Sequence, residues 1–304
     1  MNSIWASRAV PAILAAMGAG ALTLWIAVPS QYASLEKRVP DMDVGTATTQ
    51  AVKVVTDLKG ALVAGEGKPG ELPGAWPGFR GPRLDAISTE QVPLIREWKS
   101  TGPAKLWSVT LGEGYAGAAV LNGRVYVLDY DETGRADVLR CMSLADGKDI
   151  WRRSYNIDIG RNHGISRTVP AVTDKYVITL GPKCHVVCAD AQTGDFKWGI
   201  DLVREYRTTV PPWYAGQCPL IDGERVILAP GGSSLMIAVD CATGNVLWKA
   251  PNPRQWSMTH SSIAAMTFNG KRMYVYCGSG GVAGVSAETG AILWETTAWK
   301  VNMA

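Results

Sequence analysis

The sequence predicts an all-β protein built from a repeated four-stranded unit, and three observations lead to this prediction. A turn glycine followed four residues later by tryptophan occurs four times. The chain has 33 Gly and 17 Pro, and 12 Trp but only 3 Phe, which indicates many turns and one repeated tryptophan role. The repeated tryptophans lie 47, 50 and 46 residues apart, a period typical of propellers and solenoids, at Trp151, Trp198, Trp248 and Trp294.

Two turns divide each unit into four strands. The later turn contains the repeat glycine, whose positive φ suits a tight hairpin. The earlier turn is a dipeptide such as Asn-Gly between two β-rich runs, at 122–123, 174–175, 222–223 and 269–270. Apolar residues alternate with period two rather than 3.6, which argues against a helical solenoid. The unit is therefore a propeller blade of four antiparallel strands. The repeat glycines are Gly147, Gly194, Gly244 and Gly290.

The N-terminal segment is predicted to direct export. No charged residue occurs from Ala9 to Leu35, and residues 10–28 are almost wholly apolar. Residues 1–30 are therefore a membrane anchor or a signal peptide. The length of the apolar run favours the anchor, whereas Val28-Pro29-Ser30 loosely fits a cleavage site. We accordingly expect a membrane-anchored protein that faces the periplasm or the exterior.

Residues 31–75 are predicted to be a linker, because they mix Lys, Asp, Gly, Thr and Pro without strand alternation. Within them, Val52, Val55, Leu58 and Leu62 recur at helical spacing, which indicates a short linker helix over 49–63.

The globular part begins at Trp76-Pro77-Gly78-Phe79-Arg80-Gly81-Pro82. This entry motif, together with the Gly/Trp repeats, resembles the PQQ-like β-propeller repeat family, which includes BamB and the quinoprotein alcohol dehydrogenases. The resemblance covers residues 76–304 and implies that each repeat tryptophan packs between neighbouring blades. It specifies the fold far better than the activity, since one fold hosts many functions.

Residues 104–109 match the tryptophan-bearing fourth strand of a blade, but the first three strands of that blade are missing upstream. Trp107 lies 44 residues before Trp151. In propellers such a strand usually completes the last blade and closes the ring. Only ten residues follow Trp294. We therefore expect four blades plus a closing strand from a longer, C-terminally truncated propeller, that is, an incomplete ring; a compact four-bladed ring is the alternative.

Candidate ligand contacts lie in the loops that enter the innermost strands, because propellers commonly bind ligands at one mouth of the central channel. These loops are rich in polar and aromatic residues, a composition typical of ligand sites. The same side chains could instead plug the channel or serve the structure. The candidates are Glu113, Tyr115, His163, Arg167, Trp213, Tyr214, Gln217, Trp256 and His260.

Two functions remain open. The family resemblance implies either a binding or scaffold propeller similar to BamB, with a protein or small molecule at the channel mouth, or a dehydrogenase that oxidises an alcohol or sugar with PQQ and calcium. Neither an adjacent Cys-Cys pair nor a Cys-x-x-Cys-His motif is present, and no catalytic or metal-ligating residue can be assigned. The balance of 30 basic and 27 acidic residues argues against a nucleic-acid partner.

Overall fold

The computed structural model describes residues 3–27, 55–98, 100, 102–162 and 164–299. The chain divides into two compact units, Met1–Met42 and Asp43–Ala304. The first unit contains the helix α1 (Ser3–Ala27). Among the described residues, no helix has the length and apolar character needed to cross a membrane. The predicted cleavage site at 28–30 and the first part of the predicted linker, 31–54, lie outside the described residues.

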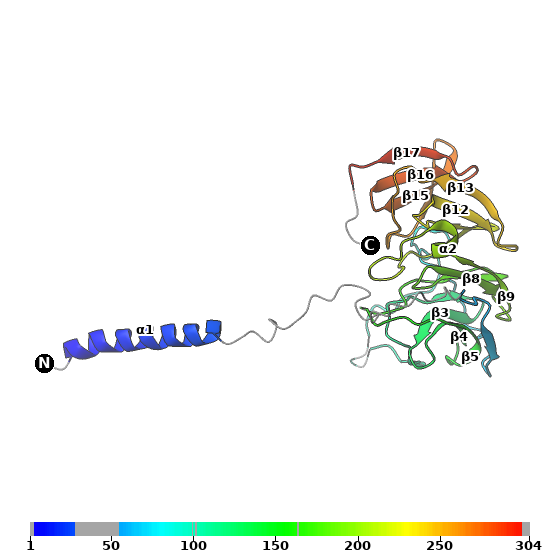
Figure 1. The fold of residues 1–304 in the computed structure, drawn as a ribbon. Helices are drawn as coiled ribbons and strands as arrows, with labels where there is room; N and C mark the ends of the chain where they lie inside the picture. Colours follow the sequence, from blue (N-terminus) through cyan, green and yellow to red (C-terminus); the bar gives the residue numbers. More distant parts are fainter. Residues whose placement is uncertain (1–2, 28–54, 99, 101, 163, 300–304) are drawn as a thin grey trace. The chain divides into compact units, whose positions relative to one another are not determined.

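The second unit consists of four sheets, which follow one another from β3–β5 to β15–β17 (Figure 1). Each sheet pairs its four propeller strands in chain order, as predicted for blades. Blade 1 comprises β2 (Ala119–Leu121), β3 (Arg124–Asp131), β4 (Ala136–Ser143) and β5 (Asp149–Asn156). Blade 2 comprises β6 (Ala171–Val172), β7 (Tyr176–Leu180), β8 (His185–Asp190) and β9 (Phe196–Asp201). Blade 3 comprises β10 (Leu220–Asp222), β11 (Arg225–Leu228), β12 (Ser234–Asp240) and β13 (Val246–Pro251). Blade 4 comprises β14 (Ala264–Phe268), β15 (Lys271–Gly278), β16 (Gly281–Ser286) and β17 (Ile292–Thr296). The short helix α2 (Leu202–Tyr206) connects blades 2 and 3.

The repeat-glycine turns and the first hairpins of blades 1 and 4 have the expected backbone, whereas Asp174 and Lys175 of blade 2 do not have positive φ. In the first hairpin of blade 1, Asn122 and Gly123 have φ of 50° and 69°, the conformation that a two-residue type I′ turn requires. The repeat glycines have φ between 71° and 76°. Directly opposite each repeat tryptophan, the neighbouring strand carries a small residue: Cys141, Cys188, Ala238 or Gly284. A small residue there leaves room for the indole beside the sheet.

The tryptophans join the blades in one direction. The ring of Trp198 in blade 2 packs on Gly244 of blade 3, where an added Cβ would come within 2.7 Å of the indole. Its N–H donates to the Cys241 carbonyl at 2.8 Å. The same pairing joins Trp151 to Gly194 and Trp248 to Gly290. Because the glycine both makes the turn and admits the indole, the Gly/Trp motif specifies the joint between consecutive blades.

The first and last tryptophans depart from this arrangement. Trp107 packs on Gly147 of blade 1 and donates to the Leu144 carbonyl at 2.9 Å, as a preceding blade's tryptophan would. The predicted strand around it is not formed, however, since residues 104–110 do not pair with any sheet strand. Trp294 instead turns its indole N–H onto the Met273 sulfur of its own blade, 3.3 Å away, and is 39% exposed. The joint needs only one ring over one glycine, so Trp107 docks without strand pairing. Closure of the ring is not shown.

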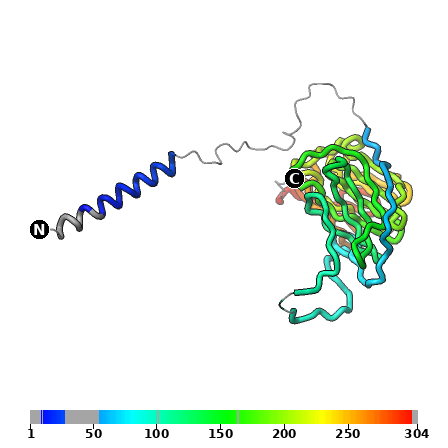
Figure 2. Tube along the Cα trace, turned by 90° about the horizontal axis from the view of Figure 1, so that it is seen from below, coloured from blue at the N-terminus to red at the C-terminus, as the bar shows by residue number. Residues whose placement is uncertain are grey.

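The second half of the predicted linker is part of the sheet structure. The strand β1 (Ala61–Ala64) pairs antiparallel with β5 at the outer edge of blade 1, so the predicted helix over 49–63 is wrong within its described part. The segment runs along the outside of the blades (Figure 2). Arg153 donates to the Lys59 carbonyl, and the Leu62 side chain reaches Gly194 of blade 2. The pairing with β5 and these two contacts outweigh the local helical spacing.

Candidate functional site at the channel mouth

The loops that enter the innermost strands bring several of the predicted side chains together. Those of blades 1 and 2 are tied together by their backbones: Tyr115 N–H donates to the Ser166 carbonyl at 2.7 Å, and Ile165 N–H donates to the Glu113 carbonyl at 2.9 Å. The loop positions are therefore fixed before any ligand arrives. We call the side chains gathered here the mouth cluster. It consists of Glu113, Tyr115, Arg161, Arg167, Lys183, Tyr214 and His260.

One half of the mouth cluster is an exposed aromatic ring with a cation behind it. Tyr115 is 68% exposed, and the Arg167 guanidinium carbon lies 5.3 Å from the centre of its ring, within cation–π range. Arg167 also donates to the carbonyls of Asn162 and Gly164, at 3.1 and 3.2 Å. Burial lowers the pKa of Arg167, although the guanidinium stays protonated at physiological pH. These bonds hold Tyr115 and Arg167 as one rigid face.

The other half centres on Tyr214. Its backbone is left-handed, with φ of 66°, and its hydroxyl donates to the Gly160 carbonyl. His260 Nε2 donates to the Tyr214 carbonyl at 2.8 Å, which assigns the proton of the neutral imidazole to that nitrogen. Burial lowers the pKa of His260, and the positive charge of Arg167 lowers it further against the opposing effect of the Tyr214 hydrogen bond. His260 is therefore neutral at physiological pH.

Lys183, which the sequence analysis did not single out, belongs to the same cluster. Its ammonium lies 4.8 Å from the centre of the Tyr214 ring. Lys183 sits in the loop between the second and third strands of blade 2. In an up-and-down blade, the loop between the second and third strands lies at the same end as the loop that enters the innermost strand. Counting strands in the sequence could therefore have identified Lys183 as a neighbour of the entry loops.

Four predicted contacts lie elsewhere or remain untested. Gln217 is fully buried and bonds both backbone groups of Ala229, donating at 3.3 Å and accepting at 2.8 Å. Trp256 is 5% exposed and packs against glycines of blade 4. Both are structural in this geometry, because neither has surface to offer a ligand. Trp213 is half-buried next to Tyr214 in the chain, and His163 lies outside the described residues.

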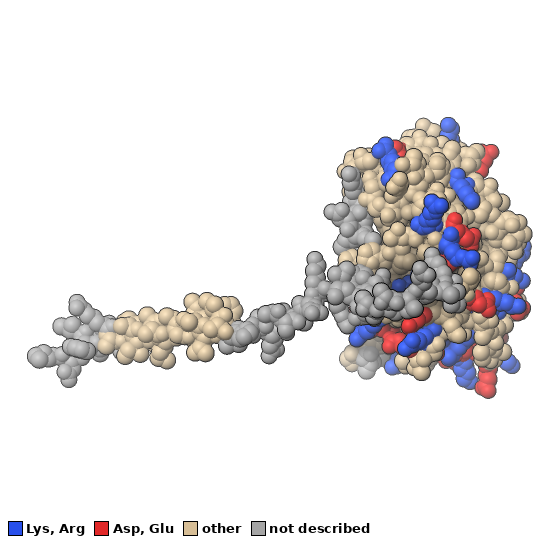
Figure 3. Space-filling model, viewed as in Figure 1, with Lys and Arg blue, Asp and Glu red and all other residues tan. Residues whose placement is uncertain are grey.

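Among the residues that the structure describes, the mouth cluster includes one carboxylate, and it is already engaged. Glu113 forms an ion pair with Arg161, so it is poorly placed to act as a general base. Arg161, Arg167 and Lys183 outnumber it, and the cluster is cationic. Elsewhere, on the face in Figure 3, basic and acidic side chains are interspersed over the blades. The arrangement suits the binding of an anionic or aromatic group more than proton transfer.

A model of the family described as outer membrane protein assembly factor BamB matches residues 135–302. The chain belongs to this family. Among solved structures, BamB from Moraxella catarrhalis shares 16% identity at a TM-score of 0.47, over 67% of this chain and 58% of that one. The quinohemoprotein alcohol dehydrogenase from Comamonas testosteroni shares 19% identity at 0.43, over 62% and 37%. The enzyme ADHIIG from Pseudomonas putida HK5 shares 18% at 0.42, over 61% and 34%.

The BamB-family chain thus spans about a third of the length of these dehydrogenases and rather more than half of that BamB. No curated protein sequence matches it. A calcium ion beside a bound quinone needs several convergent oxygen ligands. Within the described ranges, no three His, Cys, Asp or Glu side chains gather to hold a metal ion. With Glu113 paired to Arg161, the described residues do not fit PQQ with calcium.

Proposed function

We propose that this BamB-family propeller is a non-catalytic module that binds a protein partner through the mouth cluster. The observation that supports it most directly is the exposed Tyr115 ring held over Arg167. Tyrosine and arginine are enriched among the residues that dominate protein interfaces. A ring fixed before binding loses little conformational entropy when a partner covers it.

The charge of the cluster defines the chemistry of the partner. Arg161, Arg167 and Lys183 face one carboxylate, Glu113, and His260 is neutral. An acidic segment that also carries aromatic or apolar side chains would complement this surface. Opposite charge mainly raises the rate of association and the selectivity.

The proposed location is outside the cytoplasm. It rests on the uncharged N-terminal stretch from Ala9 to Leu35, which is typical of an exported chain. Fractionation of the producing cells tests this proposal. We expect the protein in the envelope fraction; an alkaline wash then distinguishes an anchored chain, which stays with the membrane, from a cleaved one, which is released. Recovery in the cytoplasmic fraction would contradict export.

Site-specific photo-crosslinking tests the binding surface. A photoactivatable phenylalanine replaces Tyr115 in one variant and Phe268, an exposed aromatic residue of blade 4, in the matched control. We expect a discrete crosslinked protein from position 115 that is lost when Arg167→Ala is added, and none from position 268. The proposal would be overturned if positions 115 and 268 gave the same crosslinked products. It would also be overturned if the product from position 115 persisted in a folded Arg167→Ala variant.

A titration with PQQ and calcium tests the dehydrogenase alternative directly. Because the described residues do not fit PQQ with calcium, we expect no saturable binding. Absorbance and calorimetry would each detect such binding if it occurred. Tight stoichiometric binding would refute the non-catalytic assignment even if crosslinking from position 115 succeeded.

A further inference from the structure

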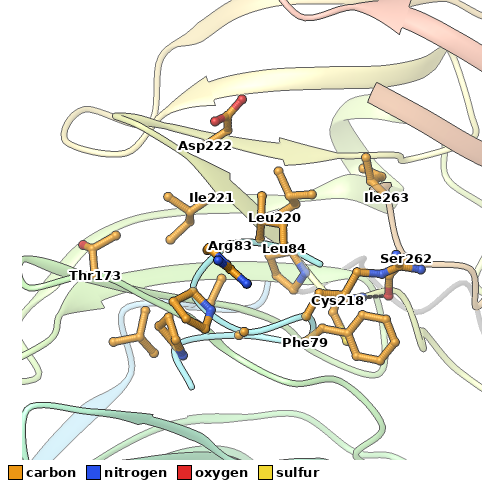
Figure 4. A pocket seen from close by; sticks show the side chains of 18 of the residues that line it. Phe79, Arg83, Leu84, Thr173, Cys218, Leu220, Ile221, Asp222, Ser262 and Ile263 are labelled. Carbon is orange, nitrogen blue, oxygen red and sulfur yellow. Dashed lines mark hydrogen bonds between the residues drawn. The ribbon is translucent and has the colours of Figure 1, made fainter. Parts of the chain in front are cut away.

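A second feature of the propeller is a cavity that shares no residue with the mouth cluster. This half-open cavity of about 400 Å³ lies between the entry segment 77–84, the innermost strands of blades 2 and 3, and Ser262, Ile263 and Arg272 of blade 4. Figure 4 shows Phe79, Arg83 and Leu84 near Leu220 and Ile263. Its walls include β6 and β10 together with Cys218 and Ser262, which come shortly before β10 and β14, but no side chain of the mouth cluster. The volume falls in the range of small-molecule sites.

The entry motif is anchored firmly enough to form a wall. Trp76 exchanges two backbone hydrogen bonds with Val120 of β2, at 2.7 and 2.9 Å, and Val172 N–H of β6 donates to the Pro77 carbonyl at 2.8 Å. Gly81 has φ of 73° and lies under the Trp76 ring, where a Cβ would come within 2.8 Å of the indole. Only glycine fits both the backbone and the space, which explains this part of the motif.

The turn that carries Arg80 is held in a costly conformation. Leu84 and Ala86 both have left-handed backbones, with φ of 60° and 63°. A left-handed backbone is unfavourable for such residues and persists only where the surroundings impose it, commonly at binding sites. The Ala86 N–H donates to the Arg80 carbonyl at 2.9 Å and closes the turn. The backbone of Arg80 is therefore fixed beside the cavity.

The charges around the cavity single out Arg80. Arg83 forms an ion pair with Asp85 at 3.2 Å, and Arg272 holds Asp222 through two bonds of 2.9 and 3.0 Å. In the part of the chain that the structure describes, no acidic side chain is paired with Arg80. Arg80 thus presents an uncompensated guanidinium at the cavity, and guanidinium geometry matches a carboxylate bidentately.

The rest of the lining is mainly apolar, with one suitable hydroxyl. Phe79 is exposed and Leu84 and Ile221 are half-buried, so these three offer carbon surface to the cavity, whereas Leu220 and Ile263 are buried. Ser262 accepts a hydrogen bond from the Cys218 N–H at 3.0 Å, so its own proton is available to donate. A ligand that complements the site needs an anionic end and an apolar body.

We propose that this cavity binds a small organic carboxylate, with the carboxylate on Arg80 and the apolar body against Phe79, Leu84 and Ile221. This assigns a purpose to the entry motif: Trp76 and Gly81 fix the turn, and Phe79 and Arg80 supply apolar and cationic contacts. The site is independent of the protein-binding surface, because none of its residues belongs to the mouth cluster.

Ligand-observed NMR and calorimetry on the full chain test the proposal, with benzoate as the probe. Benzamide has nearly the same shape without the charge, and phosphate has the charge without the apolar body. We expect benzoate to bind, benzamide to bind at least about tenfold more weakly, and phosphate not to bind, because a charge-assisted bond and the apolar contact are both required. Equal affinity for benzoate and benzamide, or for benzoate and phosphate, would refute the assigned chemistry, and absence of benzoate binding would refute the site.

Three variants locate the bound probe. Arg80→Gln should weaken benzoate binding at least about tenfold, and Arg80→Lys should weaken it less, because the charge remains while the bidentate geometry is lost. Arg96→Gln, an exposed arginine outside the cavity, is the matched control and should change nothing. Arg80 is exposed, so all three variants should keep the melting temperature of the parent. Unchanged benzoate affinity in folded Arg80→Gln would overturn the proposal.

Discussion

The joint between blades 2 and 3 allows a quantitative test of the tryptophan docking. Trp198 is 7% exposed, its ring covers Gly244, and its N–H bonds the Cys241 carbonyl. A buried tryptophan removes about 200 Å² from water, which at about 25 cal/mol per Å² is worth about 5 kcal/mol. Trp198→Ala should therefore lower the free energy of unfolding by about 4 to 5 kcal/mol, including the carbonyl left without its donor.

Trp294 provides the matched comparison, because it has the same repeat position but 39% of it is already exposed. Its indole packs on its own blade and bonds no carbonyl of a following one. The same calculation gives about 3 kcal/mol as an upper value, and we expect Trp294→Ala to cost about 2 kcal/mol. Trp198→Phe, which keeps most of the packing, should cost less than Trp198→Ala.

Urea unfolding followed by circular dichroism measures all three variants, and tryptophan fluorescence supplies a second probe of the same transition. The midpoint should fall most for Trp198→Ala, with an unchanged slope. If Trp198→Ala and Trp294→Ala cost the same, the repeat tryptophans stabilise their own blades and not the joints. That result would refute the docking argument.

Three further predictions concern groups inside the blades. Burial raises the pKa of Asp137 to about 7, and the hydrogen bond from Tyr155 opposes this shift. Because the folded pKa lies above the unfolded value of 3.8, the protonated carboxyl stabilises the fold fully below about pH 4, and this stabilisation is lost as the pH rises toward 7. Asp137→Asn should therefore flatten the dependence of the free energy of unfolding on pH, measured by urea titrations across that range. Gln217→Ala should cost about 2 to 3 kcal/mol in thermal melts and leave crosslinking from position 115 intact, whereas a ligand contact would show the reverse. Leu62→Asp should expose β1 to limited proteolysis while β5 stays protected, and equal protection of β1 would contradict its packing on Gly194.

The sequence by itself determined the blades and the way they are joined. The Gly/Trp spacing is a local requirement, because a glycine that makes the turn and admits an indole must occur once in every blade. Gly244 and Trp198 show that the two halves of one joint belong to neighbouring repeats. The loops of the mouth could be located for the same reason: strand counting fixes which end each loop occupies.

Only the tertiary structure decided which loop residues form the surface and what the N-terminal segments do. Gln217 and Tyr115 both lie in entry loops, yet one turns inward to bond Ala229 and the other stays exposed, since the choice depends on backbone groups distant in sequence. The strand β1 owes its conformation to the free edge of β5, a partner about ninety residues away that no local propensity encodes. In both cases the hydrogen-bond partner lies elsewhere in the chain: Ala229 for the Gln217 side chain and β5 for β1. These distant partners, and not the local sequence, decide the conformation.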